Sequence, residues 1–268
     1  MSDHWDQHAR QWEHIGPPLR PGPMDVAHVE RLLGEIDISQ AVLLGVTPEL
    51  ARLRWPKGAR LAAVDRNPGM VAHIWPHEMV SVPAVAVLGE WQRLPFGNNS
   101  VDVVLGDGCY TLLVGSRGYD ALSREVNRVL RPDGHFIMRF FVRPERPESP
   151  ANVLDDLRHS RIGNFHIFKW RLAMALHESF VSGVAVADVW KMWKTAGVDA
   201  DALVRDLGWS RSAIDTIDVY RASDARYSFA TVKELRAALA PYFREVSCHF
   251  PNYELGDRCP IFLLAPKR

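Results

Sequence analysis

The sequence has few cysteines, no long apolar run and no excess of charge of either sign. Its three cysteines, Cys109, Cys248 and Cys259, form no C-x-x-C pair. They therefore predict neither a disulfide framework nor a zinc site, and we expect no metal. No stretch is apolar enough to span a bilayer, and the start MSDHWDQHARQW is polar and aromatic, unlike a signal peptide. We therefore expect a cytoplasmic protein without membrane contact.

Charge is balanced, with 32 Lys and Arg against 32 Asp and Glu in 268 residues. Because no global field would attract nucleic acid, no such partner is expected, although a local basic groove is not excluded. A hydrophobic content of 47% suits one large domain, or one domain that carries an insertion.

The stretch from Ala41 to Met70 organises the rest of the prediction. An apolar run, AVLL, ends at Gly45; a helix-competent segment from Glu49 to Trp55 follows, and a second apolar run, LAAV, ends in Asp65. Two continuously apolar strands joined through a helix predict a parallel crossover. An acid about 20 residues after the glycine is placed to bind ribose hydroxyls. The stretch thus predicts a nucleoside site. An Asp65 that only caps its own turn is an equally weighted alternative at this point.

The turn after the first strand lacks the glycines that a pyrophosphate needs. Of a G-x-G-x-x-G pattern only Gly45 is present, and Glu49 would place a negative charge at the helix start. Dinucleotide binding is therefore disfavoured. A phosphate-free cofactor carrying an adenosine and a sulfonium would tolerate this turn better. Nearby, the stiff segment PPLRP holds Arg20, which we interpret as a surface side chain in preference to a clamp for a carboxylate.

Further strands alternate with helices as far as Val142. We predict strands over 84–88, 101–105 and 135–142 with intervening helices, which is typical of a doubly wound α/β sheet of the Rossmann-like kind. After RPERPESP, roughly 80 residues of helical pattern, about four short helices, are interpreted as a cap over the strand tips. An oligomerisation surface or extra core is an equal alternative. A helix over 231–242, opened by Thr231 and Glu234 as a capping box, and strands near 245–250 and 260–264 complete the core.

Two segments, GEWQRLPFGNNSVDVVLGDG and LSREVNRVLRPDGHFIMRFF, carry a family resemblance. They resemble the middle of class I S-adenosylmethionine (SAM)-dependent methyltransferases. In that family an acid follows the third strand, L-P-F precedes a strand with S-[FV]-D, and E-x-x-R-V-L-R-P-G-G introduces the fifth. The resemblance covers about Ala41 to Val142 and resumes near the C-terminus. Two departures are Asp133 in place of a glycine and the variant turn GVTPE in place of G-x-G-x-G.

The resemblance implies a seven-stranded sheet with an antiparallel C-terminal strand and a helical insertion after the fifth strand. It divides the chain into N-terminal helices capping the cofactor site (1–40), a SAM-binding core (41–145 and 228–268) and a substrate cap (146–227). Nine residues are implied to bind the cofactor: Gly45 and Thr47 at the methionine part, Asp65 at the ribose, Arg66 and Asn67 beside the adenine or ribose, Glu90 and Trp91 at the adenine, and Asp107 with Gly108 closing the site. For Trp91 a core aromatic, and for Asp107 a turn cap, are the structural alternatives.

The implied reaction is methyl transfer by in-line displacement to an oxygen or nitrogen of a small molecule, leaving S-adenosylhomocysteine (SAH). Alignment supplies much of the rate, and a base is needed only if the acceptor must lose a proton. No catalytic residue is assigned, because histidines such as His135, His159, His166 and His177 more often pack or face solvent. The alternatives are a noncatalytic protein of this fold that binds a ligand or partner through the insertion, and a nicotinamide-dependent oxidoreductase. A homodimer through the insertion is also considered.

Overall fold

The computed structural model describes residues 2–268, with side chains described from Trp5 onward. It centres on a seven-stranded sheet in the order β3-β2-β1-β4-β5-β9-β8. The strands are β1 (Gln40–Leu44), β2 (Arg60–Asp65), β3 (Ala84–Leu88), β4 (Val101–Asp107), β5 (Leu130–Arg139), β8 (Phe243–His249) and β9 (Ile261–Pro266). β1 to β5 run parallel, and β9 runs antiparallel to both of its neighbours. The predicted doubly wound sheet with a terminal antiparallel hairpin is confirmed.

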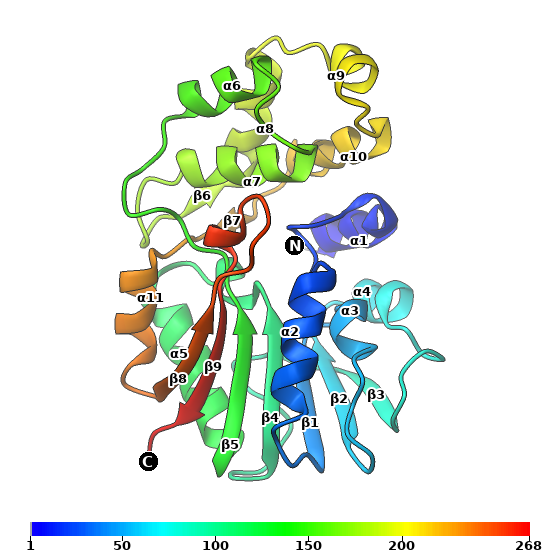
Figure 1. Ribbon diagram of the computed structural model, residues 1–268, viewed down its shortest axis with the longest axis vertical. Helices are drawn as coiled ribbons and strands as arrows, with labels where there is room; N and C mark the ends of the chain where they lie inside the picture. The colour runs from blue at the N-terminus through cyan, green and yellow to red at the C-terminus, as the bar shows by residue number, and fades with distance from the viewer. Residues whose placement is uncertain (1) are drawn as a thin grey trace.

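Helices cover both faces of the sheet (Figure 1). α2 (Pro23–Leu33), α3 (Pro48–Ala51) and α4 (Pro68–Ile74) pack on the face that carries Leu43 and Leu105. α5 (Gly115–Val129) and α11 (Val232–Leu239) pack on the face that carries Leu44 and Val104. Successive side chains of a strand point to opposite faces, so a strand buried on both faces must be apolar throughout.

Several element boundaries differ from the prediction by a few residues, and two of these differences change the local structure. The helix after β1 spans only four residues, because the chain turns after Ala51 and buries Trp55, whose indole N–H donates to the Ala51 carbonyl at 3.0 Å. β5 begins at Leu130 instead of His135. Val101 pairs with Leu130 and Val103 with His135, so residues 131–134 form an irregularity within the strand and not a turn before it.

The insertion contains more elements than predicted. Its helices are α6 (Pro150–Arg158), α7 (Phe165–Ala175), α8 (Val186–Thr195), α9 (Ala200–Leu207), α10 (Arg211–Asp215) and the 3₁₀ turn η3 (Thr216–Tyr220). A small antiparallel pair, β6 (Val184–Ala185) with β7 (Arg226–Tyr227), was not predicted, because two-residue strands leave no periodic signal. The insertion buries a separate apolar core and lies beyond the carboxyl ends of the parallel strands (Figure 1).

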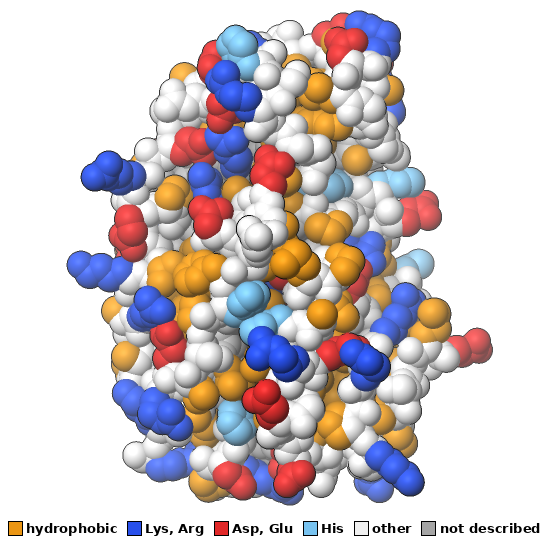
Figure 2. Space-filling view, in the orientation of Figure 1, with side chains coloured by type: hydrophobic (Ala, Val, Ile, Leu, Met, Phe, Trp, Pro, Cys, Tyr) orange, Lys and Arg blue, Asp and Glu red, His pale blue; other side chains and the backbone are white. Residues whose placement is uncertain are grey.

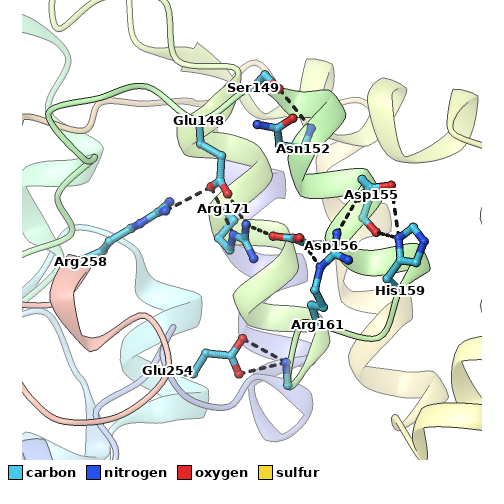
Figure 3. A network of polar contacts seen from close by, with 11 residues as sticks. Glu148, Ser149, Asn152, Asp155, Asp156, His159, Arg161, Arg171, Glu254 and Arg258 are labelled. Carbon is cyan, nitrogen blue, oxygen red and sulfur yellow. Dashed lines mark hydrogen bonds and ion pairs between the residues drawn. The ribbon is translucent and has the colours of Figure 1, made fainter.

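A polar network fastens the insertion to the C-terminal part of the sheet (Figure 3). Glu148, in the hinge before α6, accepts hydrogen bonds from Arg171 of α7 and, at 3.1 Å, from Arg258 in the loop before β9. Arg171 also pairs with Asp156 of α6 at 2.5 Å. Burial acts to raise the pKa of Glu148, but the two guanidinium groups hold this pKa below its usual range. The network therefore joins α6, α7 and the β8–β9 loop while Glu148 is ionised.

The N-terminal segment lies between the strand tips and the insertion (Figure 1). α1 (Ser2–Arg10) packs against α4 and η3, and η1 (Trp12–His14) follows it. A loop with a cis bond between Pro17 and Pro18 then leads into α2. α1 thus bridges the two parts of the molecule that meet above the sheet.

Acidic and basic side chains are interspersed over the face drawn in Figure 2. No helix among residues 2–268 is both long and apolar enough to cross a membrane. The domain division, the cytoplasmic location and the homodimer expected above stay predictions.

Candidate active site

One cavity lies at the carboxyl ends of β1, β2 and β4, and it includes about 1250 Å³ of empty space, part of it open to solvent. All of the residues predicted to bind a cofactor line it: Gly45, Thr47, Asp65, Arg66, Asn67, Glu90, Trp91, Asp107 and Gly108. We call these residues the strand-tip wall. The structure thus brings them together, while their roles as cofactor ligands stay predictions.

Gly45 shapes the turn after β1. Its φ of +87° is in the left-handed region, which residues with a Cβ adopt only with strain. Its N–H donates to the Val64 carbonyl at 2.8 Å. A Cβ at this position would lie 3.6 Å from the Trp91 ring and 3.8 Å from Asp65 Oδ2. The Gly45 backbone, the Asp65 carboxylate and the Trp91 indole therefore meet at one end of the cavity.

Asp65 is 9% exposed at the tip of β2. Its Oδ1 accepts a hydrogen bond from the backbone N–H of Asn67 at 2.8 Å, so the carboxylate does cap its own turn. Burial raises the pKa of this carboxyl group. Oδ2 is the oxygen that lies toward Gly45. The carboxylate thus combines a structural hydrogen bond with a position on the cavity wall.

Neighbouring polar groups on the strand-tip wall are fixed to different degrees. The side chain of Asn67 caps α4, because its Oδ1 accepts from Met70 N at 2.7 Å. The indole N–H of Trp91 donates to the Val64 carbonyl at 2.7 Å, which orients the ring against Gly45. Arg66 and Glu90 are exposed. Side chains held by hydrogen bonds therefore lie beside Gly45, and exposed charged side chains lie farther out on this wall.

The negative charge at the start of α3 is paired within the chain. The Glu49 carboxylate contacts the Arg20 guanidinium, and these side chains are only 20% and 19% exposed. Arg20 also donates to the carbonyls of Trp12 at 3.0 Å and Ile15 at 3.2 Å. The interpretation of Arg20 as a surface side chain is wrong. It clamps a carboxylate of its own chain and removes the unpaired charge that the turn was expected to present.

Asp107 belongs to a buried ion network. Its carboxylate accepts from Arg139 Nε at 2.7 Å and Nη2 at 3.1 Å, and Arg139 Nη1 donates to the Pro18 carbonyl at 2.9 Å. Asp25 lies 3.5 Å from the same guanidinium and accepts from the Tyr253 hydroxyl at 2.9 Å. Burial raises the pKa of Asp107, and the adjacent guanidinium opposes this. Asp107 therefore joins the sheet to the N-terminal loop and to the β8–β9 loop.

Gly108 and Cys109 complete this end of β4. Gly108 has a φ of +64°, and a Cβ there would lie 2.5 Å from the Phe141 ring, so the position requires glycine. Cys109 is 1% exposed, and its Sγ lies 3.6 Å from the Leu44 carbonyl. Burial raises the pKa of the Cys109 thiol, which stays protonated. A small, buried turn residue describes Cys109 better than a nucleophile does.

The N-terminal helices and the insertion were expected to cover this cavity, but none of the residues that line the rest of it were predicted. These apolar and aromatic residues, which we call the aromatic wall, come from η1, the loop after it, the segments after β4 and β5, and the insertion: Trp12, Leu19, Leu112, Leu113, Phe141, Trp170, Tyr220 and Tyr227. Trp5 and His8 of α1 also line the cavity. The individual residues could not be predicted, because no local pattern links segments so distant in sequence.

The strand-tip wall lies within a segment that resembles a known family. Residues 44–138 match the family model described as a methyltransferase domain. No curated protein matches the sequence.

Solved structures resemble the chain over most or all of its length, at low identity. They include the CcbJ methyltransferase from Streptomyces caelestis (15% identity, TM-score 0.59, 100% of this chain and 99% of that chain). The N-methyltransferase NodS from Bradyrhizobium japonicum, in complex with SAH, gives 11% identity, a TM-score of 0.55 and complete coverage of both chains. The 1,6-didemethyltoxoflavin-N1-methyltransferase from Burkholderia thailandensis gives 14% identity, a TM-score of 0.51, and coverage of 91% and 76%. These likenesses establish the fold of the complete chain.

The described cavity lining contains a histidine that was not considered from the sequence. His8 of α1 lines the cavity, whereas His135, His159, His166 and His177 do not, within the described part of the chain. Burial lowers the pKa of His166 to about 3 and that of His177 to about 4. Among residues 2–268 no group of three or more His, Cys, Asp or Glu side chains is arranged to hold a metal ion.

Proposed function

We propose that this protein transfers a methyl group from SAM to a small-molecule acceptor, at an oxygen or nitrogen atom. The observation that carries the proposal is the meeting of Gly45, Asp65 and Trp91 at one end of a cavity whose other side is formed by the N-terminal segment and the insertion. Cavities at the carboxyl ends of parallel strands are where such sheets bind ligands. The two walls would hold the cofactor and the acceptor against each other.

The residues present fit SAM better than they fit a dinucleotide. The GVTPE turn offers a single glycine, but SAM has no phosphate that would need the others. Asp65 Oδ2 would accept hydrogen bonds from the ribose hydroxyls, and the fixed Trp91 indole would pack against the adenine. Since Arg20 neutralises Glu49, a cofactor carboxylate near Thr47 would not meet an unpaired negative charge.

SAM supplies a methyl group on a positively charged sulfur, which is already a good leaving group. The acceptor atom forms a bond to the methyl carbon while the carbon–sulfur bond breaks, its electron pair stays on sulfur and the acceptor proton passes to solvent. The chain contributes alignment of the two molecules, which is worth much of the rate. α1 and the insertion would exclude water from the reacting atoms, because they lie over the strand tips (Figure 1).

Calorimetric titration with SAM, SAH and NAD tests the proposal. We expect SAM and SAH to bind and NAD to give no heat. Asp65→Ala should weaken SAH binding at least about a hundredfold, because two hydrogen bonds to a charged carboxylate are lost. Asp133→Ala, an exposed position in the irregular part of β5, is the matched control and should bind SAH normally. A folded protein that binds neither SAM nor SAH would favour the noncatalytic, ligand-binding alternative.

A further inference from the structure

Two tryptophans of the aromatic wall have indole N–H groups that no other described residue satisfies. Trp170 of α7 is 6% exposed, and neither its Nε1 nor that of Trp12 has a hydrogen-bond partner in the described part of the chain. Elsewhere the indoles of Trp55, Trp91 and Trp190 donate to protein oxygens at 2.7 to 3.0 Å. A buried donor without a partner is unfavourable. Both tryptophans also line the same cavity, so a ligand bound there would be the nearest source of the acceptor that they lack.

The rings around Trp170 are held in defined orientations. Trp170 makes edge-to-face contacts with Phe141 (5.1 Å between centroids, 82°) and with Tyr227 (5.3 Å, 64°). Tyr227 in turn meets Tyr220 edge to face at 6.0 Å. Such interlocked rings keep a fixed shape, and aromatic pairs gain stability beyond the area that they bury. The wall is therefore preformed for a rigid, flat molecule.

Charged groups of the cavity lining belong to the other wall. Among the described lining residues, Asp65, Arg66, Glu90 and Asp107 are on the strand-tip wall, whereas the aromatic wall offers hydroxyl and indole groups. His8 of α1 adds an imidazole to the lining outside both walls. Recognition at the aromatic wall must then rest on ring contacts and on hydrogen bonds donated by neutral groups.

We propose that the methyl acceptor is a planar aromatic compound with a carbonyl oxygen or ring nitrogen that accepts a hydrogen bond from the indole N–H of Trp170, with Trp12 as a second donor. That the bound compound accepts a methyl group rests on the proposed function. Its binding at the aromatic wall does not require SAM. Trp170 and Trp12 are thus specificity-determining residues.

The test uses three probes of similar size: 2-naphthol, decahydro-2-naphthol and 7-hydroxycoumarin. Calorimetry measures their dissociation constants for the full-length protein, alone and saturated with SAH. We expect 2-naphthol to bind at least about threefold more tightly than its saturated analogue, because only the flat ring makes aromatic contacts. 7-Hydroxycoumarin adds the carbonyl, so its affinity relative to 2-naphthol reports the hydrogen bond.

The decisive measurement compares this relative affinity in wild type and in Trp170→Phe, which keeps a ring but removes the N–H. The substitution should lower the affinity of 7-hydroxycoumarin relative to 2-naphthol about three- to tenfold, the range of one neutral hydrogen bond. The affinities for 2-naphthol and SAH should stay unchanged. Trp12→Phe should lower the relative affinity of 7-hydroxycoumarin less. Trp190→Phe, whose N–H donates to Asp218 outside the cavity, is the matched control.

Two results would contradict the inference directly. In the first, the affinity of 7-hydroxycoumarin relative to 2-naphthol is the same in wild type, Trp170→Phe and Trp12→Phe. In the second, no aromatic probe binds the SAH-saturated protein. Either result would overturn the inference, as would equal binding of the flat and saturated rings. If SAH fails to bind while the probe pattern holds, the transferase proposal falls and the aromatic site stands. If SAH binds and the expected order of probe affinities is not seen, the aromatic-site inference falls and the transferase proposal stands.

Discussion

The strand-tip wall and the aromatic wall of the cavity are built in different ways. The predicted residues of the strand-tip wall lie within one continuous stretch, from Gly45 to Gly108, and parallel strands bring their carboxyl ends to one edge. The aromatic wall collects residues from Trp12 to Tyr227. The first wall is polar and follows from backbone geometry, whereas the second is apolar and depends on how separate segments pack. With this division, the strand-tip wall would keep the same reaction while changes in the aromatic wall alter the substrate.

The two walls are joined at a few positions near the end of β4. Arg139 pairs with Asp107 of the strand-tip wall, and its guanidinium also lies 5.0 Å from the ring centroid of Phe141 in the aromatic wall. Gly108 packs against the same ring. Substitutions at these positions should damage both walls, whereas those elsewhere should damage only one.

The largest effect is expected from Arg139→Met. It would leave the buried carboxylates of Asp107 and Asp25 without their cation, and breaking a buried pair in this way costs about 3 to 5 kcal/mol of unfolding free energy. Denaturant titration at pH 7 measures this. Arg131→Met is the control, because Arg131 is 44% exposed and its contact with Asp102 should contribute less than about 1 kcal/mol. Equal effects of the two substitutions would contradict a buried, ionised network.

The next largest effect is expected from Gly108→Ala. A Cβ would be strained by the positive φ, by about 1 to 2 kcal/mol, and would also collide with Phe141, adding about 1 to 3 kcal/mol. Gly58→Ala separates the two causes, because Gly58 has a φ of +91° but nothing within 4 Å of a Cβ. Denaturation of both variants should show the larger loss for Gly108→Ala. Similar losses would mean that Phe141 moves aside, and the walls would then be less tightly joined than described.

The sequence predicted the strand-tip wall because its signals are local. Apolar runs marked the buried strands, and the acid after the second run marked the position of Asp65. The capping box at the start of α11 was also predicted and is confirmed: Thr231 N donates to Glu234 Oε2 at 2.7 Å, and Glu234 N donates to Thr231 Oγ1 at 3.2 Å. Such motifs are complete within a few residues.

The remainder could not be predicted, because it depends on contacts between distant segments. The partner of Glu49 is Arg20, 29 positions earlier by residue number, and nothing in either segment identifies the other. Asp107 was expected to close the site, whereas its carboxylate is held by Arg139, an interaction that needs β4 and β5 in register. Trp170 lines the cavity only because α7 packs over the strand tips.

A smaller effect, confined to the strand-tip wall, is expected from Arg20→Met. It would leave Glu49 unpaired at the start of α3 and weaken SAH binding about tenfold, the size of one charge repulsion at moderate distance near a protein surface. The double variant Arg20→Met/Glu49→Gln should recover most of the affinity, since the repelling charge is then absent. Calorimetry measures both. No recovery would show that Arg20 acts by fixing the N-terminal loop through its bonds to Trp12 and Ile15.

The smallest effect concerns pH and the frame of the aromatic wall. His166 is 5% exposed on α7, four positions before Trp170, and its Nε2 lies 3.0 Å from the His14 carbonyl beside η1. Burial, with Lys169 nearby, lowers the pKa of His166 to about 3 from an ordinary value of 6.5. As the pH falls, His166 is therefore protonated in the unfolded chain before it is protonated in the folded protein. The stability from neutral His166 is complete above pH 6.5, and it is lost by about 1.4 kcal/mol per pH unit as the pH falls toward 3.

At pH 5.5 this amounts to about 1 kcal/mol relative to pH 7.5. Denaturant titrations between these pH values give the slope of the unfolding free energy against pH. His166→Gln should reduce this slope by the contribution of one proton, while Trp190→Phe should keep the wild-type slope. Because a pKa of about 3 keeps His166 neutral in the folded protein over this range, its contact with the N-terminal segment persists. The free energy of unfolding should therefore respond to this group, whereas the affinity of the folded protein for 2-naphthol should not. An identical slope in His166→Gln would mean that another imidazole, such as the half-buried His177 or His28, carries the pH dependence, because partial burial lowers the pKa of each to about 4.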